Sequence, residues 1–466
     1  MKIKLLNFVI GLILTTTLFS ACVESHHDGE VIVSAEASIK SFEIEDIYTT
    51  SKVIVDGKEV EKIDTVIGKS YPFVINQRKR TIHNLDSLPV GTNVSRVIAK
   101  IQADSPFIFY EKNNKDTVWT PTDSLDFSKP ISFKVKAYDM TFGDKYRVQI
   151  NVHKQHPNQI TWSEQTPVFA NNEVKEQKAI LFKDVIYVFA NGEKQVKVTS
   201  SAATDGKVWS ELTELAIPEK VDYASAIVFG EQVYVIAEGS LYTSADMTKW
   251  EKMESAPAMK SLIVANNNKS NQSLIGINQE NVFVESKEGD IWTEKGTVHK
   301  LFPERNISSV AYTLNTNDEI SRLIVLGENA LSNDTIANVW GKLTNEDDWS
   351  TYYSTDKTNR PSPNFKNISM IHYNNQLYTF GGEAIKGGTI IPAFSVFYSS
   401  TNNGLDWTPE KDDLTFPESF TRNYKQSNGN YSCVIDNNDF IWIIWSNGGV
   451  WKGRINKLGF DKASKE

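Results

Sequence analysis

Cysteine and methionine are scarce in this sequence, and long basic or apolar runs are missing. The 466 residues include 2 cysteines and 6 methionines, so a disulfide framework cannot organise the fold. Lysine and arginine number 49 against 58 acidic residues, which gives a formal net charge of −9. Such a chain lacks the cationic surface that displaces counterions from nucleic acid. The composition therefore argues against a nucleic-acid partner.

Aromatic residues, in contrast, are plentiful. The chain contains 11 tryptophans, 17 tyrosines and 23 phenylalanines, and aromatic side chains favour strands over helices. A chain of this length is expected to form more than one domain. We therefore predict an all-β protein with at least two domains.

The N-terminus carries the pattern of an export signal. Lys2 and Lys4 precede an apolar stretch from Leu5 to Leu14, and small and polar residues follow up to Ala21, which is the order of a signal peptide. The apolar stretch is shorter than the about 20 residues that a stable membrane-spanning helix needs. We expect no other segment to span a membrane.

The signal ends in Leu18-Phe19-Ser20-Ala21-Cys22, which resembles the lipobox of bacterial lipoproteins. The resemblance implies that residues 1–21 are removed and that Cys22 becomes the lipidated N-terminus, followed by a polar tether over residues 22–33. We therefore expect a cell-envelope lipoprotein whose lipid anchors it to the outer membrane, on the periplasmic or the surface face. A soluble secreted protein with an incidental Cys22 is the alternative. The other cysteine, Cys433, is expected to be an inert core thiol.

Residues 34–156 alternate apolar and polar side chains with a period of two. The alternation is regular over residues 131–137 and 146–152, and Asp56-Gly57 is a strong hairpin signal. We predict a small antiparallel β-sandwich. The segment Asp126-Phe127-Ser-Lys-Pro130, with Tyr146-Arg-Val148 after it, resembles Ig-like modules of Bacteroidota surface lipoproteins. The resemblance implies a spacer or mating surface.

Residues 157–460 contain a repeat of about 45 residues, which is typical of propellers. Each unit has an apolar strand pair and a tryptophan after a polar turn. The strand pairs span residues 179–189, 226–236, 262–277, 310–326, 370–380 and 433–444. The tryptophans are Trp162, Trp209, Trp250, Trp292, Trp349 and Trp407.

The two ends of this repeat region complement each other. Ile160–Gln165 precedes the first strand pair, whereas Val450–Ile455 follows the last pair and lacks a fourth strand. Pairing these two segments completes a sixth blade and removes the exposed sheet edges. We predict a six-bladed β-propeller closed by a shared blade.

The turn before Trp407 has a second signature. Ser400-Thr-Asn402-Asn-Gly404-Leu-Asp-Trp407 resembles the Asp-box pattern of sialidases and other propellers, and Tyr378-Thr-Phe380-Gly381-Gly382 resembles the end of a kelch strand. With the lipobox and the sandwich, these features resemble a family of uncharacterised two-domain lipoproteins from Bacteroidota. That resemblance implies the architecture and no established activity.

The sequence offers no complete catalytic or metal-binding set. A sialidase needs three arginines around a carboxylate. We do not expect any three of the five arginines in the propeller region to converge; these are Arg305, Arg322, Arg360, Arg422 and Arg454. Cys433 with His299 and His372 does not supply a galactose-oxidase-like copper site. No zinc-protease, EF-hand, P-loop or nucleophile-elbow motif occurs. We predict no cofactor and no metal.

The longest loops fall in the fourth and fifth blades, over residues 350–366, 383–392 and 408–426. Aromatic and arginine side chains are preferred anchors of recognition surfaces, although loops also lengthen without a functional reason. The candidate ligand-binding residues are Tyr352, Tyr353, Arg360, Glu383, Lys386, Arg422 and Tyr424.

Two functions follow from this reasoning. The first is a non-catalytic scaffold that binds a glycan or a protein through these loops. The alternative is a glycan-active hydrolase or lyase that uses the loop carboxylates Glu304, Glu383 and Glu418.

Overall fold

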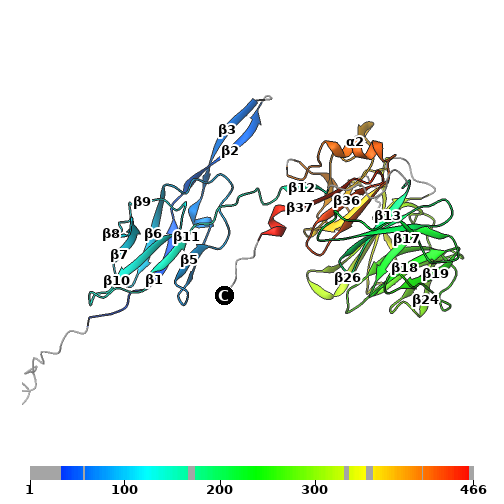
Figure 1. Ribbon diagram of the computed structural model, residues 1–466, viewed down its shortest axis with the longest axis horizontal. Coiled ribbons are helices and arrows are strands. Elements are labelled where there is room, and N and C mark those ends of the chain that lie inside the picture. Colours follow the sequence, from blue (N-terminus) through cyan, green and yellow to red (C-terminus); the bar gives the residue numbers. More distant parts are fainter. Residues whose placement is uncertain are drawn as a thin grey trace, which may run out of the picture. The chain divides into compact units, whose positions relative to one another are not determined.

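The computed structural model describes residues 33–55, 58–165, 174–329, 335–352, 360–411 and 413–460. Cys22, the Asp56-Gly57 turn and Tyr353 lie outside the described residues. The chain divides between Lys154 and Gln155 into two compact units (Figure 1). Among the described residues, no helix is both long and apolar enough to cross a membrane.

The N-terminal unit is a sandwich of two sheets and a hairpin. The first sheet has the order β1 (Ile39–Ile44), β6 (Val97–Ala103), β9 (Ser124–Leu125). The second has the order β4 (Phe73–Asn76), β5 (Thr81–Asn84), β11 (Tyr146–Gln149), β10 (Ile131–Lys136), β7 (Phe107–Lys112), β8 (Lys115–Val118). The hairpin consists of β2 (Ile47–Val55) and β3 (Lys58–Val66), and a 3-10 turn follows at Gly68–Ser70.

The core of this sandwich follows the predicted alternation. Phe133 and Val135 of β10 are fully buried, as are Tyr146 and Val148 of β11. One pairing departs from the predicted antiparallel arrangement, because β5 and β11 run parallel with Ile82 opposite Val148. A long connection between two strands permits a parallel pair, which period-two patterning does not reveal.

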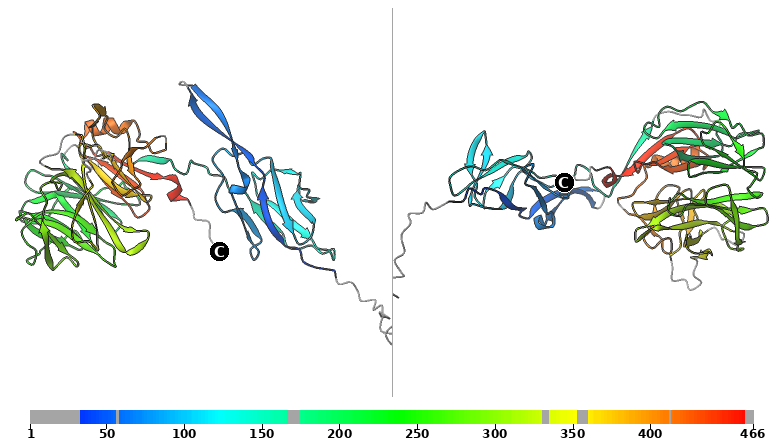
Figure 2. Two further views of the ribbon diagram at one scale, coloured as in Figure 1. Left: turned by 180° about the vertical axis from the view of Figure 1, so that it is seen from behind. Right: turned by 90° about the horizontal axis from the view of Figure 1, so that it is seen from below.

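The C-terminal unit contains six four-stranded sheets among its described residues, which confirms the predicted six-bladed propeller (Figures 1 and 2). Blade one consists of β13 (Gln177–Phe182), β14 (Val185–Ala190), β15 (Lys197–Ala202) and β16 (Thr213–Glu214). Blade two consists of β17 (Val221–Phe229), β18 (Gln232–Ala237), β19 (Ser240–Ser244) and β20 (Glu251–Lys252). Blade three consists of β21 (Met259–Asn266), β22 (Ser273–Asn278), β23 (Val282–Ser286) and β24 (Trp292–Thr297). Blade four consists of β25 (Arg305–Leu314), β26 (Asn317–Glu328), β27 (Asn338–Leu343) and β28 (Ser350–Thr351). Blade five is β29 (Ser369–Tyr373), β30 (Gln376–Phe380), β33 (Tyr398–Ser400), β34 (Thr408–Pro409).

Blade six is assembled from both ends of the propeller region. It contains β35 (Tyr431–Ile435), β36 (Ile441–Trp445), β37 (Val450–Ile455) and β12 (Ile160–Gln165). β12 pairs antiparallel with β37 over its whole length, from Ile160 opposite Ile455 to Gln165 opposite Val450. This register confirms the predicted closure, and a 3-10 turn over Asn456–Gly459 follows it.

The six tryptophans pack between blades. Each one enters the apolar cluster formed by its own blade and the preceding blade. Trp407 of blade five, for example, is fully buried with Leu326 and Val339 of blade four. The repeat is therefore visible in the sequence because each interface between blades needs one large flat side chain.

The Asp-box-like turns are held by local hydrogen bonds. Ser400 Oγ accepts the Gly404 N–H at 2.9 Å, and Trp407 Nε1 donates to the Gly404 carbonyl at 2.9 Å. Blade two has a similar turn that sequence reasoning missed, in which Asp246 Oδ1 accepts the Thr248 and Lys249 N–H groups. In this turn Met247, and not a glycine, adopts the positive φ, at +64°. The glycine that marks the motif in a sequence is therefore absent.

Candidate functional site

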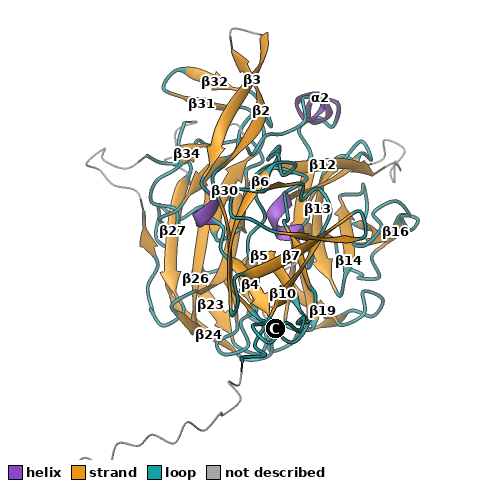
Figure 3. Ribbon diagram, turned by 90° about the vertical axis from the view of Figure 1, so that its left-hand side faces the viewer, coloured by secondary structure: helices purple, strands orange, loops and turns teal. Residues whose placement is uncertain are grey.

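The long loops of blades four and five meet at one end of the propeller. They carry the hairpin β31 (Ala384–Lys386) and β32 (Thr389–Ile391), and the helix α2 (Ser419–Gln426) (Figure 3). Thr421 Oγ1 of α2 donates to the Ala393 carbonyl at 2.8 Å, beyond β32. These loops are therefore joined to each other.

Arg360 and Lys386 are brought close together in this region. The Lys386 Nζ lies 4.5 Å from the centroid of the Tyr398 ring and 3.5 Å from the Pro361 carbonyl oxygen. Burial lowers the pKa of Lys386, and the nearby Arg360 charge lowers it further. The Arg360 backbone N–H donates to the Asp406 carboxylate at 2.8 Å. The two residues thus place two positive charges near each other, and Lys386 lies over the Tyr398 ring.

The other candidates do not form one site. Glu383 and Arg422 are exposed, whereas the Tyr352 hydroxyl accepts a hydrogen bond from Arg322 Nη1 at 3.0 Å. Tyr424 is 9% exposed and packs against Phe394, with ring centroids 5.9 Å apart. The Tyr424 ring therefore belongs to the apolar cluster of blades five and six, and its role in ligand binding stays a prediction.

The carboxylates of the alternative function come from three different connections. Glu304 lies just before β25, Glu383 precedes β31, and Glu418 precedes α2, and all three are exposed. Glycoside hydrolysis requires two cooperating carboxyl groups about 5–10 Å apart, and these three residues come from three separate connections.

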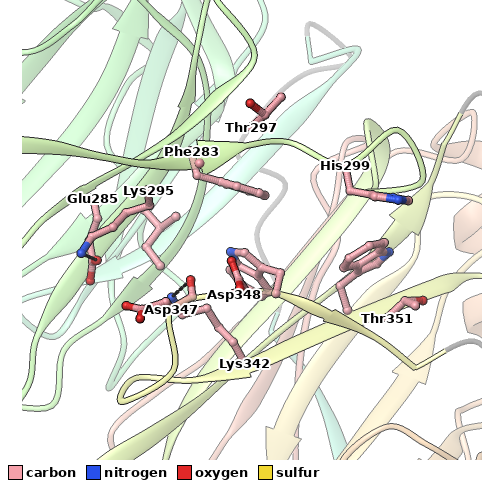
Figure 4. A pocket seen from close by; sticks show the side chains of 13 residues that line it. Phe283, Glu285, Lys295, Thr297, His299, Lys342, Asp347, Asp348 and Thr351 are labelled. Atoms are coloured by element: carbon pink, nitrogen blue, oxygen red, sulfur yellow. Dashed lines mark hydrogen bonds and ion pairs between the residues drawn. The ribbon is translucent and has the colours of Figure 1, made fainter.

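A cavity of about 380 Å³ lies between blades three and four. We call it the interblade cavity. Phe283 points from blade three towards the segment of blade four that carries Lys342, Asp347 and Asp348 (Figure 4). Most of its lining comes from β23 and β24 of blade three, and from β27, β28 and the turn between them in blade four. Strand β28 pairs with β27 only at Trp340 and Gly341.

Aromatic rings form one part of the wall. Phe283 and Trp349 are stacked with centroids 6.0 Å apart, and Trp340 lies 5.3 Å from the exposed His299 ring. Trp340 Nε1 donates to the Leu301 carbonyl at 3.2 Å, which orients that indole. Trp349 is only partly buried, so its ring is accessible to a ligand.

Charged groups form the remaining wall. The Glu285 side chain is 9% exposed, and its two oxygens lie 2.7 Å from Lys287 Nζ and 3.4 Å from Lys295 Nζ. Burial raises the pKa of Glu285, but its hydrogen bond with Lys287 and the charges of the surrounding lysines lower it more, so the net shift is downward. The carboxylate is therefore held in its ionised form.

Lys342 is the most buried cation of this wall. The residue is 6% exposed, and its Nζ donates to the Asp347 carbonyl at 3.3 Å. Burial lowers the pKa of Lys342, while the Glu285 carboxylate opposes that shift. An ammonium group has three N–H donors, so one carbonyl leaves hydrogen-bonding capacity for a bound molecule.

Sequence reasoning missed this cavity. Its residues come from separate strands and turns of two blades, and none of them forms a motif. The described residues contain no group of three or more His, Cys, Asp or Glu side chains that could hold a metal ion. Chemically, the cavity offers aromatic faces, hydrogen-bond donors and a fixed carboxylate.

The fold and this geometry define a two-domain β-propeller protein with an N-terminal β-sandwich. More specifically, the chain belongs to the DUF6242 family. Residues 42–150 match the N-terminal domain of unknown function of that family, and residues 156–463 match the DUF6242 beta propeller domain. A comparison with curated proteins gives no match.

Solved structures show distant similarity. The GH74 xyloglucanase from Xanthomonas campestris is 13% identical over 72% of this chain and 51% of that chain, with a TM-score of 0.39. The present chain thus spans about half the length of that xyloglucanase. A streptogramin B lyase is 10% identical over 65% of this chain and 99% of that chain, with a TM-score of 0.37. Similarity at this level carries no argument about activity.

Proposed function

We propose that this protein is a cell-envelope lipoprotein that binds glycan in the interblade cavity without converting it. The observation that carries the proposal is the combination of the partly exposed Trp349 with the buried Lys342 side chain in one cavity. Its volume of about 380 Å³ falls in the range of small-ligand sites. Sugar rings present apolar faces that stack on aromatics, and hydroxyl groups that pair with ammonium and carboxylate groups.

A binding role fits the charged wall better than catalysis does. A general acid needs a carboxyl group that is protonated near the working pH, but the lysines hold Glu285 ionised. The carboxylate is then suited to accept hydrogen bonds from ligand hydroxyls. A glycan-active hydrolase or lyase remains the alternative function.

The binding test uses the mature chain and a panel of neutral and acidic oligosaccharides, with affinity measured by calorimetry. Lys342→Met keeps the apolar stem but removes the ammonium, and we expect it to weaken binding at least tenfold. Trp250→Phe is the matched control for Trp349→Phe, because Trp250 has the equivalent place before the outer strand of blade two. We expect only Trp349→Phe to weaken binding.

Two results would contradict this proposal. Affinities unchanged by both cavity substitutions would place the glycan elsewhere. Release of new reducing ends from any oligosaccharide would instead support the hydrolase.

Anchoring through Cys22 is the second part of the proposal, and the lipobox-like segment supports it. The test is metabolic labelling with a clickable fatty acid in a bacterial host that processes lipoproteins. We expect the wild-type chain to carry the fatty-acid label and to be found in the membrane fraction. The Cys22→Ala variant should lack the label and leave the membrane fraction. Equal labelling of the two chains would refute the anchor.

Protein binding at the joined loops of blades four and five is a second candidate function. Ile385 and Ile390 face each other across β31 and β32 and are 41% and 67% exposed. They lie on the same hairpin as Lys386, near Arg360. Exposed apolar groups beside cations are typical of protein interfaces. If the Ile385→Ser/Ile390→Ser variant lost a captured protein partner but kept its glycan affinity, the protein would bind through this hairpin and not through the interblade cavity.

A further inference from the structure

One end of the N-terminal sandwich presents large apolar side chains to solvent. The exposed fractions are 48% for Phe107, 58% for Val118, 51% for Tyr138, 64% for Met140 and 47% for Phe142. These residues lie on β7, at the end of β8, and in the loop from β10 to β11. Phe107 and Tyr138 contact each other edge to face, with ring centroids 6.2 Å apart. We call these five residues the aromatic end patch.

The loop that carries much of this patch is held in one conformation. The Asp139 carboxylate accepts the Thr141 N–H at 2.9 Å, and the Gly143 N–H donates to the Val135 carbonyl at 2.9 Å. Phe142 packs on Phe109 with centroids 5.3 Å apart. These contacts hold the loop in place while the side chains of the patch remain exposed.

The chain enters the sandwich beside the patch. The Asp139 backbone N–H donates to the Ser34 carbonyl at 3.3 Å, and Gly143 lies so close to Ala37 that a β-carbon on the glycine would be 2.7 Å from the Ala37 β-carbon. Ser34 is separated from Cys22 by only residues 23–33. At about 3.5 Å per residue, a fully extended segment of that length reaches roughly 40 Å.

Two lysines around the patch are held in ion pairs. Lys134 pairs with Asp116, and Lys145 pairs with Glu111 at 2.8 Å. The Lys134 Nζ also lies 4.0 Å from the centroid of the Phe142 ring. The Lys136 Nζ lies 5.6 Å from the same centroid. The patch therefore offers aromatic and aliphatic side chains bordered by lysines, which is typical of groups in the interfacial region of a bilayer.

We propose that the aromatic end patch rests on the lipid bilayer in which the Cys22 lipid is inserted. This inference rests on the proposed lipid anchor, because the short segment before Ser34 then keeps this end of the sandwich near the membrane. The contact depends on apolar insertion, so it forms on neutral lipid as well as on anionic lipid.

The test places a fluorophore at the patch of the acylated full chain. Met140→Cys is labelled with an environment-sensitive dye and bound to phosphatidylcholine vesicles that contain brominated acyl chains. Lys129→Cys is the matched control, because it precedes β10 at the opposite end of that strand from the patch and is also exposed. We expect a blue shift and several-fold stronger quenching at position 140 than at position 129.

Three results would overturn the proposal. Equal quenching at both positions in a vesicle-bound, acylated chain would refute the patch and leave the anchor intact. If quenching occurred only with phosphatidylglycerol in the vesicles, the contact would depend on electrostatic attraction to anionic lipid and not on apolar insertion. A chain whose mass shows no acyl group would refute the anchor and, with it, the membrane contact.

Discussion

The hydroxyl of Tyr373 accepts a hydrogen bond from the Ile455 backbone N–H at 3.1 Å. The same hydroxyl donates to the Asp439 carbonyl at 2.8 Å. Tyr373 is on the first strand of blade five, whereas the other two residues belong to blade six. One buried phenol thus connects the last full blade to the blade that closes the ring.

Tyr373→Phe should destabilise the propeller by about 1–3 kcal/mol, because it leaves a buried N–H group without its acceptor. The measurement is urea unfolding monitored by tryptophan fluorescence. Tyr187→Phe is the control, since the structure gives its hydroxyl no hydrogen-bond partner among the described residues. Equal loss of stability in both variants would contradict the bridging role.

Trp407→Ala should cost about 3–5 kcal/mol, the usual range for removing a large buried aromatic side chain. Trp407 is 0% exposed and its indole N–H is hydrogen-bonded. Trp292 occupies the equivalent place in blade three, but it is only partly buried and its indole N–H has no hydrogen-bond partner among the described residues. We therefore expect a smaller loss of stability in Trp292→Ala, measured by the same unfolding experiment.

Asp246 should make stability depend on pH in the acid range. The Lys249 and Thr248 N–H groups lower the pKa of its carboxyl to about 2, against about 3.9 in an unfolded chain. Because the folded pKa is lower, the stabilisation is complete above pH 4 and is lost as the pH falls towards 2.

The measurement compares unfolding midpoints of the wild type and Asp246→Asn between pH 6 and pH 2. The difference between the two should shrink as the solution is acidified. Asp205→Asn, at a carboxylate with no hydrogen bond among the described residues, should show no such convergence. A constant difference at Asp246 would contradict the assigned hydrogen bonds.

Cys433 should resist alkylation in the folded protein. Cys433 is partly buried, desolvation raises the pKa of its thiol to about 12, and the thiolate is the reactive form. In the Cys22→Ala chain, iodoacetamide at pH 8 should therefore add to Cys433 slowly before unfolding and fully in urea, as followed by mass. Rapid alkylation of the folded chain would show that the thiol is accessible.

Much of the fold was predictable because its constraints are local. The alternation over residues 131–137 indicates β10, and the recurring tryptophans mark the blades. The β12–β37 pairing was predictable from two incomplete repeats that complete each other. The turn at Asp246 escaped notice because Met247 stands where the motif has glycine.

The candidate site was not predictable in the same way. Long loops pointed to Tyr424, yet burial of its ring follows from the packing of Phe394 on it, and loop length says nothing about which side chain turns inward. The interblade cavity brings Glu285 together with Lys342 from different blades. No local pattern encodes that proximity.

The sequence by itself determined the strand periodicity, the number of blades, the closure of the ring and the tryptophan interfaces, because each depends on spacing along the chain. Only the tertiary structure decided where side chains from neighbouring blades meet, and which of them remain open. The interblade cavity is one such place, since the space between two blades depends on how the side chains of both blades pack, and packing is a property of the assembled ring.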